Sequence, residues 1–171
     1  NPFNPKQQRP ISLGPQNVEA FVFWSKNPEP LIPHLPELDH RGYSYYFQFT
    51  LNSYPAVFEP RIPHLEERLA VFKKLSRKIG ANRVLWRYDP IIITENTPIH
   101  YHLKIFNQIA TELAGYTTRC TISFLDLYRK VVSRFRKLQI TTLQLSWEEI
   151  YRFCQDLQTI CANKGIQLAT C

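Results

Sequence analysis

Four of the five glycines in this 171-residue sequence separate a stretch with helical periodicity from a stretch of strand-forming residues. They are Gly42, Gly80, Gly115 and Gly165. The residue that follows the last turn of a helix commonly has a positive φ angle, which glycine adopts without steric cost. The chain is therefore expected to alternate strands and helices, and this order is typical of a parallel sheet with helical crossovers.

Five stretches rich in β-branched and aromatic residues are the expected strands. They cover residues 18–24, 43–51, 84–93, 119–127 and 166–171. The expected helices cover residues 64–79, 99–114 and 146–164, with a short proline-interrupted helix over 30–41 and a basic segment over 128–137 that can form another. Such an array is either an open sheet or part of a barrel. We predict an α/β domain with a mainly parallel strand–helix repeat, a partial TIM-like barrel that is incomplete because eight units close one.

The composition describes one globular domain, because 44% of its residues are hydrophobic and its length can bury a sizeable core. Residues 1–17 are rich in proline and are expected to form an extended loop before about five strand–helix units over 18–171. The abrupt start at Asn1 suggests a fragment of a longer protein. No apolar run approaches the ~20 residues of a membrane span. We expect no membrane partner and a cytoplasmic location.

The strand expected at residues 84–93 has two different sides. Alternation puts Val84, Trp86 and Tyr88 on one side, where they are expected to pack under helices. It puts Arg87 and Asp89 on the other side, near the carboxyl end of the strand. Function gathers at this end of the strands in parallel α/β folds. The two charges therefore indicate either a binding site or a purely structural ion pair at a strand end.

The other strands also place polar side chains at their carboxyl ends, on the same side as Arg87. These residues are Lys26, Gln48, Thr50, Thr121 and Ser123. Together they predict a pocket that binds an anion. Arg87 can hold a carboxylate or phosphate through two hydrogen bonds, with Lys26 as a point charge and hydroxyl groups completing the shell. Asp89 can orient Arg87, accept a ribose hydroxyl group or act as a base.

Several classes of site have no matching pattern in this sequence. It contains no glycine-rich phosphate loop and no G-x-S-x-G motif. His100 and His102 are two residues apart, so they do not share a helix face, and a structural or surface role is expected. The four cysteines have neither disulfide-framework nor zinc spacing, and no metal ligands are assigned. Cys171 ends a predicted strand, where a buried small residue is expected.

Two sets of motifs resemble known families. The runs Phe47–Thr50, Glu59-Pro60, Glu66–Leu69 and Arg87–Ile92 resemble a pattern in radical S-adenosylmethionine (radical SAM) enzymes related to spore photoproduct lyase. More closely, V-F-W-S-K-N-P, Y-Y-F-Q-F-T-L, W-R-Y-D-P-I and I-S-F-L-D-L-Y-R-K resemble an uncharacterised bacterial family, a domain of unknown function. Its longer members resemble radical SAM enzymes in carrying a cysteine cluster near the C-terminus.

The resemblance implies a partial barrel that binds S-adenosylmethionine and a [4Fe–4S] cluster held by three cysteines. By position, Thr50 would contact the cofactor and Arg87 its methionine carboxylate, with Gln48 and Ser123 beside them. The C-x-x-x-C-x-x-C motif is absent, so this chain cannot assemble the cluster from its own ligands. The expected function is the cofactor- and substrate-binding part of a radical SAM-like protein of unknown substrate, and the fragment alone is expected to be inactive.

Two other functions remain open at this point. A non-redox α/β-barrel module that binds a phosphate or carboxylate metabolite would use the same polar residues. A nucleic-acid-binding protein is suggested by the net charge of +7 and by the basic run at 129–137. This run has neither the interleaved aromatic residues of a single-strand binder nor a recognition-helix pattern, so nucleic acid is the less favoured partner.

Overall fold

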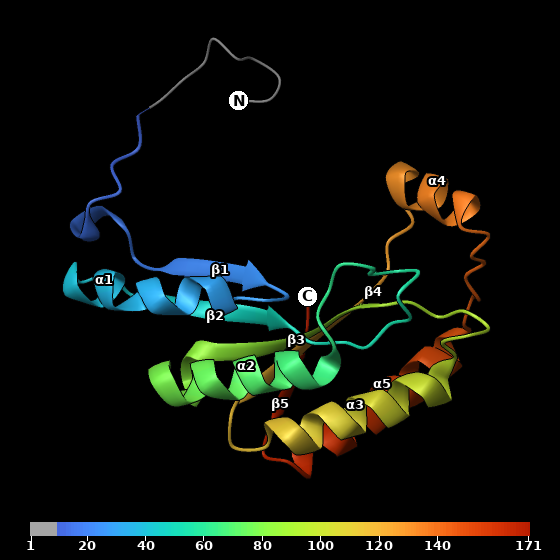
Figure 1. Ribbon diagram of the computed structural model, residues 1–171. Helices are drawn as coiled ribbons and strands as arrows, with labels where there is room; N and C mark the ends of the chain where they lie inside the picture. The colour runs from blue at the N-terminus through green and yellow to red at the C-terminus, as the bar shows by residue number, and fades with distance from the viewer. Residues whose placement is uncertain (1–9) are drawn as a thin grey trace.

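A computed structural model describes residues 10–171 and contains one five-stranded sheet (Figure 1). Its strands are β1 (Phe21–Ser25), β2 (Tyr45–Thr50), β3 (Val84–Ile91), β4 (Arg119–Phe124) and β5 (Gln167–Thr170). All neighbouring pairs are parallel and the order is β1-β2-β3-β4-β5. The predicted α/β fold is therefore confirmed. Since β1 and β5 are the two edges, the array is an open, partial barrel.

Helices connect the strands in the predicted order. The α-helices are α1 (Leu35–His40), α2 (Leu65–Ile79), α3 (Ile99–Leu113), α4 (Arg129–Lys137) and α5 (Trp147–Ala162). Short 3₁₀ helices lie at η1 (Pro15–Asn17), η2 (Glu29–His34) and η3 (Ala81–Arg83). Proline residues explain why η2 and α1 stay short, because proline lacks the N–H that continues a helix. The predicted N-terminal loop falls partly at residues 1–9, outside the described residues.

The residue types that are favoured at helix ends explain two of the helix ends but not a third. Gly80, after α2, has a φ angle of 94°, which agrees with the predicted role of glycine. Ser146 and Glu149 form a reciprocal capping box at the start of α5. Threonine is a favoured N-cap residue, but Thr97 does not cap α3, whose capping position is Pro98. The hydroxyl group of Thr97 donates instead to the backbone oxygen of Ile92, 2.7 Å away.

One face of the sheet packs under helices and forms the core. Trp86 and Tyr88 of β3 are at most 1% exposed, as alternation predicted. The ring of Trp86 lies 4.6 Å, between centroids, from Phe106 of α3. Phe49 of β2 lies 5.1 Å from Phe72 of α2 in the same way. Burial of these large aromatic side chains gives this face most of the hydrophobic stabilisation of the domain.

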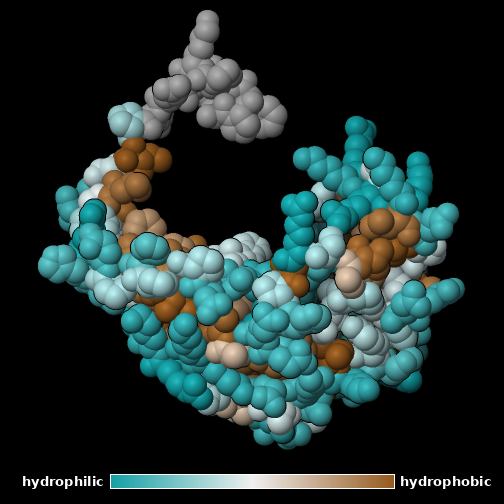
Figure 2. All heavy atoms as spheres, in the orientation of Figure 1, coloured by the Kyte–Doolittle hydropathy of each residue, from teal (hydrophilic) through white to brown (hydrophobic). Residues whose placement is uncertain are grey.

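The opposite face of the sheet, called the inner face here, has no helical layer over it among residues 10–171. Val22 and Trp24 of β1 point to this side and are 48% and 63% exposed. Figure 2 shows the molecule hollowed on the side away from α2, α3 and α5. The inner face is therefore open to other molecules. None of the described helices combines the length and apolar character needed to cross a membrane.

Candidate functional site

The site is built by the register of the parallel strands. Thr50 of β2 is paired with Arg87 of β3, and Arg87 with Thr121 of β4. Gln48 is paired with Trp24 of β1. Because paired residues of neighbouring strands point to the same face, these side chains form a row near the carboxyl ends of the strands. The structure thus brings together most of the residues that the sequence selected.

Arg87 is at the centre of this row. Its Nε donates to Oδ2 of Asp89 over 2.9 Å, and its Nη1 donates to Oε1 of Gln48 over 2.8 Å. Its Nη2 donates to the same oxygen of Asp89 and, over 3.2 Å, to Sγ of Cys171. The other carboxylate oxygen of Asp89 accepts a hydrogen bond of 2.7 Å from the hydroxyl group of Ser123. Arg87 lies on the predicted side, and Asp89 is its ionic partner.

The surroundings of Arg87 shield it although it lies on an open face. Its side chain is 5% exposed, and the ring centroid of Trp24 is 4.2 Å from its guanidinium carbon. Burial by itself would lower the pKa of Arg87, but hydrogen bonds to Cys171 and Asp89 raise it above the ordinary value. Four of the five N–H groups of Arg87 have acceptors. The fifth N–H group, on Nη1, has no acceptor among residues 10–171.

Thr50 and Lys26 form no hydrogen bond with Arg87 or Asp89 and contact other residues instead. The hydroxyl group of Thr50 accepts a hydrogen bond of 3.3 Å from Nε1 of Trp24. The ammonium group of Lys26 forms an ion pair with Glu59 and lies 3.4 Å from Oδ1 of Asn52. Lys26 therefore points to the loop before α2, and its charge is balanced there. Whether it binds an anion stays a prediction.

Three further residues belong to this region, although the sequence analysis did not include them among the predicted binding residues. Glu59 pairs with Lys26, Trp24 stacks on Arg87, and Cys171 reaches Arg87 from β5. The expectation that Cys171 is buried was wrong, because its side chain is exposed beyond the edge strand. Glu59 belongs to the Glu59-Pro60 motif, which carried the family resemblance but gave no sign of an ion pair 33 residues away.

The histidines have the structural or surface role expected of them. His100 is exposed, and His102 is fully buried on the helix-covered side of the sheet. The ring of His102 forms hydrogen bonds with the hydroxyl group of Tyr88 and the backbone oxygen of Ile92. Burial lowers the pKa of His102 and raises that of Tyr88, so both are neutral near pH 7.

The cysteines do not fit a [4Fe–4S] cluster. Cys120 and Cys161 are buried on the helix-covered side, whereas Cys171 is on the inner face. Burial, together with a hydrogen bond to Cys161, raises the pKa of Cys120, which keeps it a protonated thiol. No group of three histidine, cysteine or acidic side chains suited to a metal ion occurs within residues 10–171. A step that requires the cluster is therefore not assigned to this chain.

The fold and the row of polar groups define the class as an α/β partial-barrel domain with a candidate binding site at the carboxyl ends of its strands. The family model "Domain of unknown function (DUF1848)" matches residues 1–171. The chain belongs to this family, as the motifs in its sequence had indicated. A search of curated proteins gave no match.

A solved structure of a spore photoproduct lyase variant "with bound AdoMet and dinucleoside spore photoproduct" has a similar fold, with a TM-score of 0.63. The two sequences are 16% identical, and the match covers 87% of this chain. This chain spans about half the length of that structure, since the match covers 50% of it. The similarity shows that the fold resembles that of a radical SAM enzyme.

Proposed function

We propose that this chain is the cofactor- and substrate-binding part of a radical SAM-like protein, and that its inner face binds S-adenosylmethionine. The observation that carries this proposal is the group around Arg87, which joins Gln48, Asp89 and Ser123 at the carboxyl ends of β2, β3 and β4. This group lies beside the exposed ring of Trp24. The related fold of spore photoproduct lyase, solved with AdoMet, supports the same ligand.

The chemical groups of this site suit the two ends of S-adenosylmethionine. The remaining N–H group of Arg87 and the hydroxyl group of Thr50 can donate to its carboxylate. Asp89 holds Arg87 in place and can accept a hydrogen bond from an ammonium or ribose hydroxyl group. The indole ring of Trp24 offers a flat apolar surface on which the adenine ring can stack. The substrate would lie in the open hollow above these residues.

A non-redox module that binds a carboxylate or phosphate metabolite is the second candidate. It is favoured by the scattered cysteines, which supply no site for the cluster that gives radical SAM enzymes their chemistry. It would use the same positive group, Arg87, on the same face. It differs from the first proposal in needing no contact with an adenosine.

A nucleic-acid-binding role rests on the net charge of +7 and on the basic residues of α4. All its charged residues are basic and exposed, namely Arg129, Lys130, Arg134, Arg136 and Lys137. None of them forms an ion pair with another residue of the 10–171 segment. Binding of this kind would weaken steeply as salt is added, because phosphate contacts release counterions. This dependence distinguishes it from binding at the inner face.

Titration calorimetry of the chain with S-adenosylmethionine tests the proposal. Arg87→Ala should weaken binding by roughly 1.5–3 kcal/mol, about 10- to 150-fold, since a charged hydrogen bond is lost. Arg136→Ala removes an exposed arginine of α4 and should leave the affinity unchanged. Adenosine, methionine and phosphate serve as separate ligands. Binding of methionine or phosphate without any gain from the adenosine moiety would favour the metabolite module, and equal affinity in Arg87→Ala would remove Arg87 from the site.

A further inference from the structure

The five cations of α4 account for most of the charge excess of the chain. Without them, 16 basic side chains would face 14 acidic ones, and the net charge would fall from +7 to +2. The helix contains no acidic residue, and none of its cations pairs with a carboxylate of residues 10–171. On the inner face, by contrast, Asp89 balances Arg87 and Glu59 balances Lys26. The excess positive charge is therefore concentrated on one nine-residue helix.

This charge pattern is unfavourable for α4 as an isolated helix. Arg129 and Lys130 lie in its first turn, at the positive end of the helix dipole, where acidic residues are favoured. Lys130 and Arg134 are four residues apart, so their like charges repel each other across one turn. An anion that lies along the helix would offset both costs. An open groove of about 420 Å³ is available for it, lined by Arg129, Lys130, Ser133, Arg134 and Lys137.

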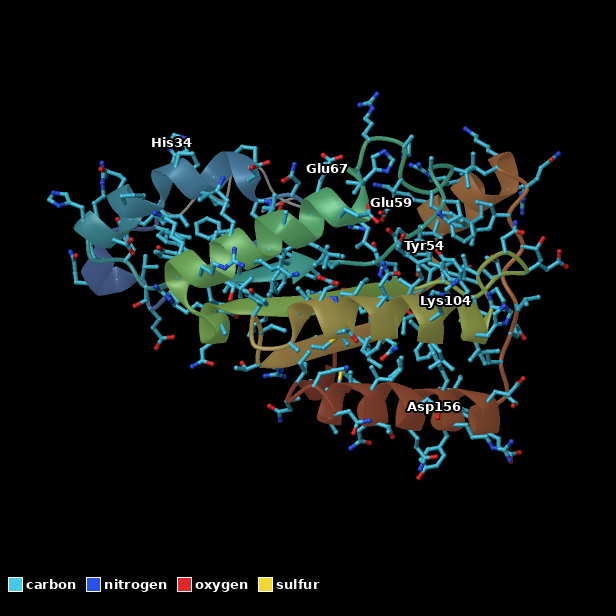
Figure 3. All side chains as sticks on the ribbon, turned by 60° about the horizontal axis from the view of Figure 1, so that its bottom comes forward. His34, Tyr54, Glu59, Glu67, Lys104 and Asp156 are labelled. Carbon is cyan, nitrogen blue, oxygen red and sulfur yellow. The ribbon has the colours of Figure 1, made fainter. Side chains whose placement is uncertain are left out.

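The helix α4 stands at the border of the inner face. It begins six residues after Ser123, so the Cα atoms of Ser123 and Arg129 are at most about 22 Å apart. Figure 1 shows α4 on the side of the sheet away from α2, α3 and α5, and Figure 2 shows hydrophilic side chains there beside the hollow. Figure 3 shows α4 near Tyr54 and Glu59 of the loop that follows β2. A ligand bound along α4 can therefore reach the inner face.

We propose that α4 binds the phosphate groups of a single-stranded nucleic acid, and that this strand is the substrate of the inner face. The cations extend from residue 129 to residue 137, about 12 Å along the helix axis. Successive phosphate groups of a strand fit such a row, whereas a small metabolite would need a more enclosed pocket. The inference rests on the function proposed above and names the substrate class of its site. It differs from the nucleic-acid candidate there, because one strand contacts both surfaces.

The side chains around α4 favour a single strand over a duplex or a lipid bilayer. Tyr128 directly precedes α4 and is 61% exposed. Unpaired bases stack on exposed aromatic rings of this kind, whereas the bases of a duplex are already stacked on each other. Val131 and Phe135 are half-buried, and the ring centroids of Phe135 and Phe58 are 6.0 Å apart. These apolar side chains pack on the protein and are not free to insert into a bilayer.

Fluorescence anisotropy of a labelled single strand of about 12 nucleotides, titrated with the full chain, tests the inference. Lys130→Gln/Lys137→Gln removes two cations of the groove. Lys74→Gln/Lys78→Gln is the matched control, because it removes two exposed lysines of α2 on the helix-covered side and gives the same net charge. Glutamine supports a helix about as well as lysine does, so α4 should stay folded.

The α4 variant should bind the strand at least about tenfold more weakly, and the control should bind it like the unchanged chain. The slope of log K against log salt should also become shallower by about 1.4 in the α4 variant, since each phosphate contact of a single strand contributes about 0.7. Equal losses in both variants would show a general charge effect and overturn the inference. So would the absence of binding, or equally tight binding of a duplex, of tripolyphosphate or of phosphatidylglycerol vesicles.

An NMR titration of the ¹⁵N-labelled chain with the same strand, without S-adenosylmethionine, tests whether the strand reaches the inner face. The indole N–H of Trp24 and the amide of Ser123 should shift together with the amides of α4. Shifts confined to α4 would overturn the assignment of the strand as the substrate. Failure of S-adenosylmethionine to bind would refute the proposed cofactor and leave both strand measurements unchanged, so the two failures are distinguishable.

Discussion

The two faces of the sheet use adjacent residues of the same strands for different purposes. On the helix-covered face, Trp86 is fully buried and packs on Phe106 of α3. On the inner face, Trp24 is 63% exposed and lies against Arg87. The first face is packed with buried aromatic side chains under the helices. The second carries a hydrogen-bonded polar group and has no helical layer over it among residues 10–171. The comparison indicates that stability comes mainly from one face and that the other is available for binding.

The difference should appear most strongly when each tryptophan is replaced. Trp86→Ala removes a buried ring and its hydrogen bond of 2.8 Å to the backbone oxygen of Leu51. It should lower the free energy of unfolding by about 3–5 kcal/mol. Trp24→Ala should lower it by less than about 1 kcal/mol, because most of that ring is already exposed. Urea denaturation of both variants measures these changes, and similar losses would refute the division of roles between the two faces.

The ion pair of the inner face should give the next largest effect. Asp89→Ala leaves Arg87 shielded from water and without its carboxylate, which should cost roughly 2–3 kcal/mol of unfolding free energy. Arg87→Ala should cost less, since Asp89 keeps its hydrogen bond from Ser123 and is 14% exposed. The double variant should be more stable than the sum of the two losses predicts. Simple additivity in denaturation experiments would show that the pair is not coupled.

The helix-covered face should also show a dependence on pH through His102. Burial lowers its pKa, so below about pH 6.5 the unfolded chain gains a proton that the folded chain does not. The free energy of unfolding should therefore fall as the pH drops from 6.5 toward the lowered pKa, by at most about 1.4 kcal/mol per pH unit. His102→Gln should reduce this slope, whereas His100→Gln, at an exposed position, should not. Denaturation at pH 5 to 8 measures both, and an unchanged slope in His102→Gln would contradict the assignment.

Local patterns predicted the fold and part of the site. The alternation of β3 separated Trp86 from Arg87 correctly, because a strand period of two is a property of the chain itself. The parallel order followed from the glycine positions, which separate strands from helices, and the place of the site followed from the rule that function gathers at the carboxyl ends of strands. These signals require only neighbouring residues. They were sufficient to place Gln48, Asp89 and Ser123 beside Arg87.

Contacts that depend on loops could not be predicted in this way. The pairing of Lys26 with Glu59 joins residues 33 positions apart, and the loop before α2 brings them together. The exposure of Cys171 depends on how β5 ends at the edge of the sheet. The buried Nη1 of Arg68 has no hydrogen-bond partner among residues 10–171, which depends on the path of the chain around Pro63. Each of these features follows from tertiary packing, which periodicity does not encode.

The central claim is that the inner face at the carboxyl ends of the strands binds S-adenosylmethionine. The most direct test is an NMR titration of the ¹⁵N-labelled chain with this ligand, followed by backbone amide and indole signals. The account predicts that the largest shifts occur at Thr50, Arg87, Ser123 and the indole N–H of Trp24, while signals of α3 and α5 stay in place. Shifts confined to the helices, or no saturable shifts at all, would contradict it.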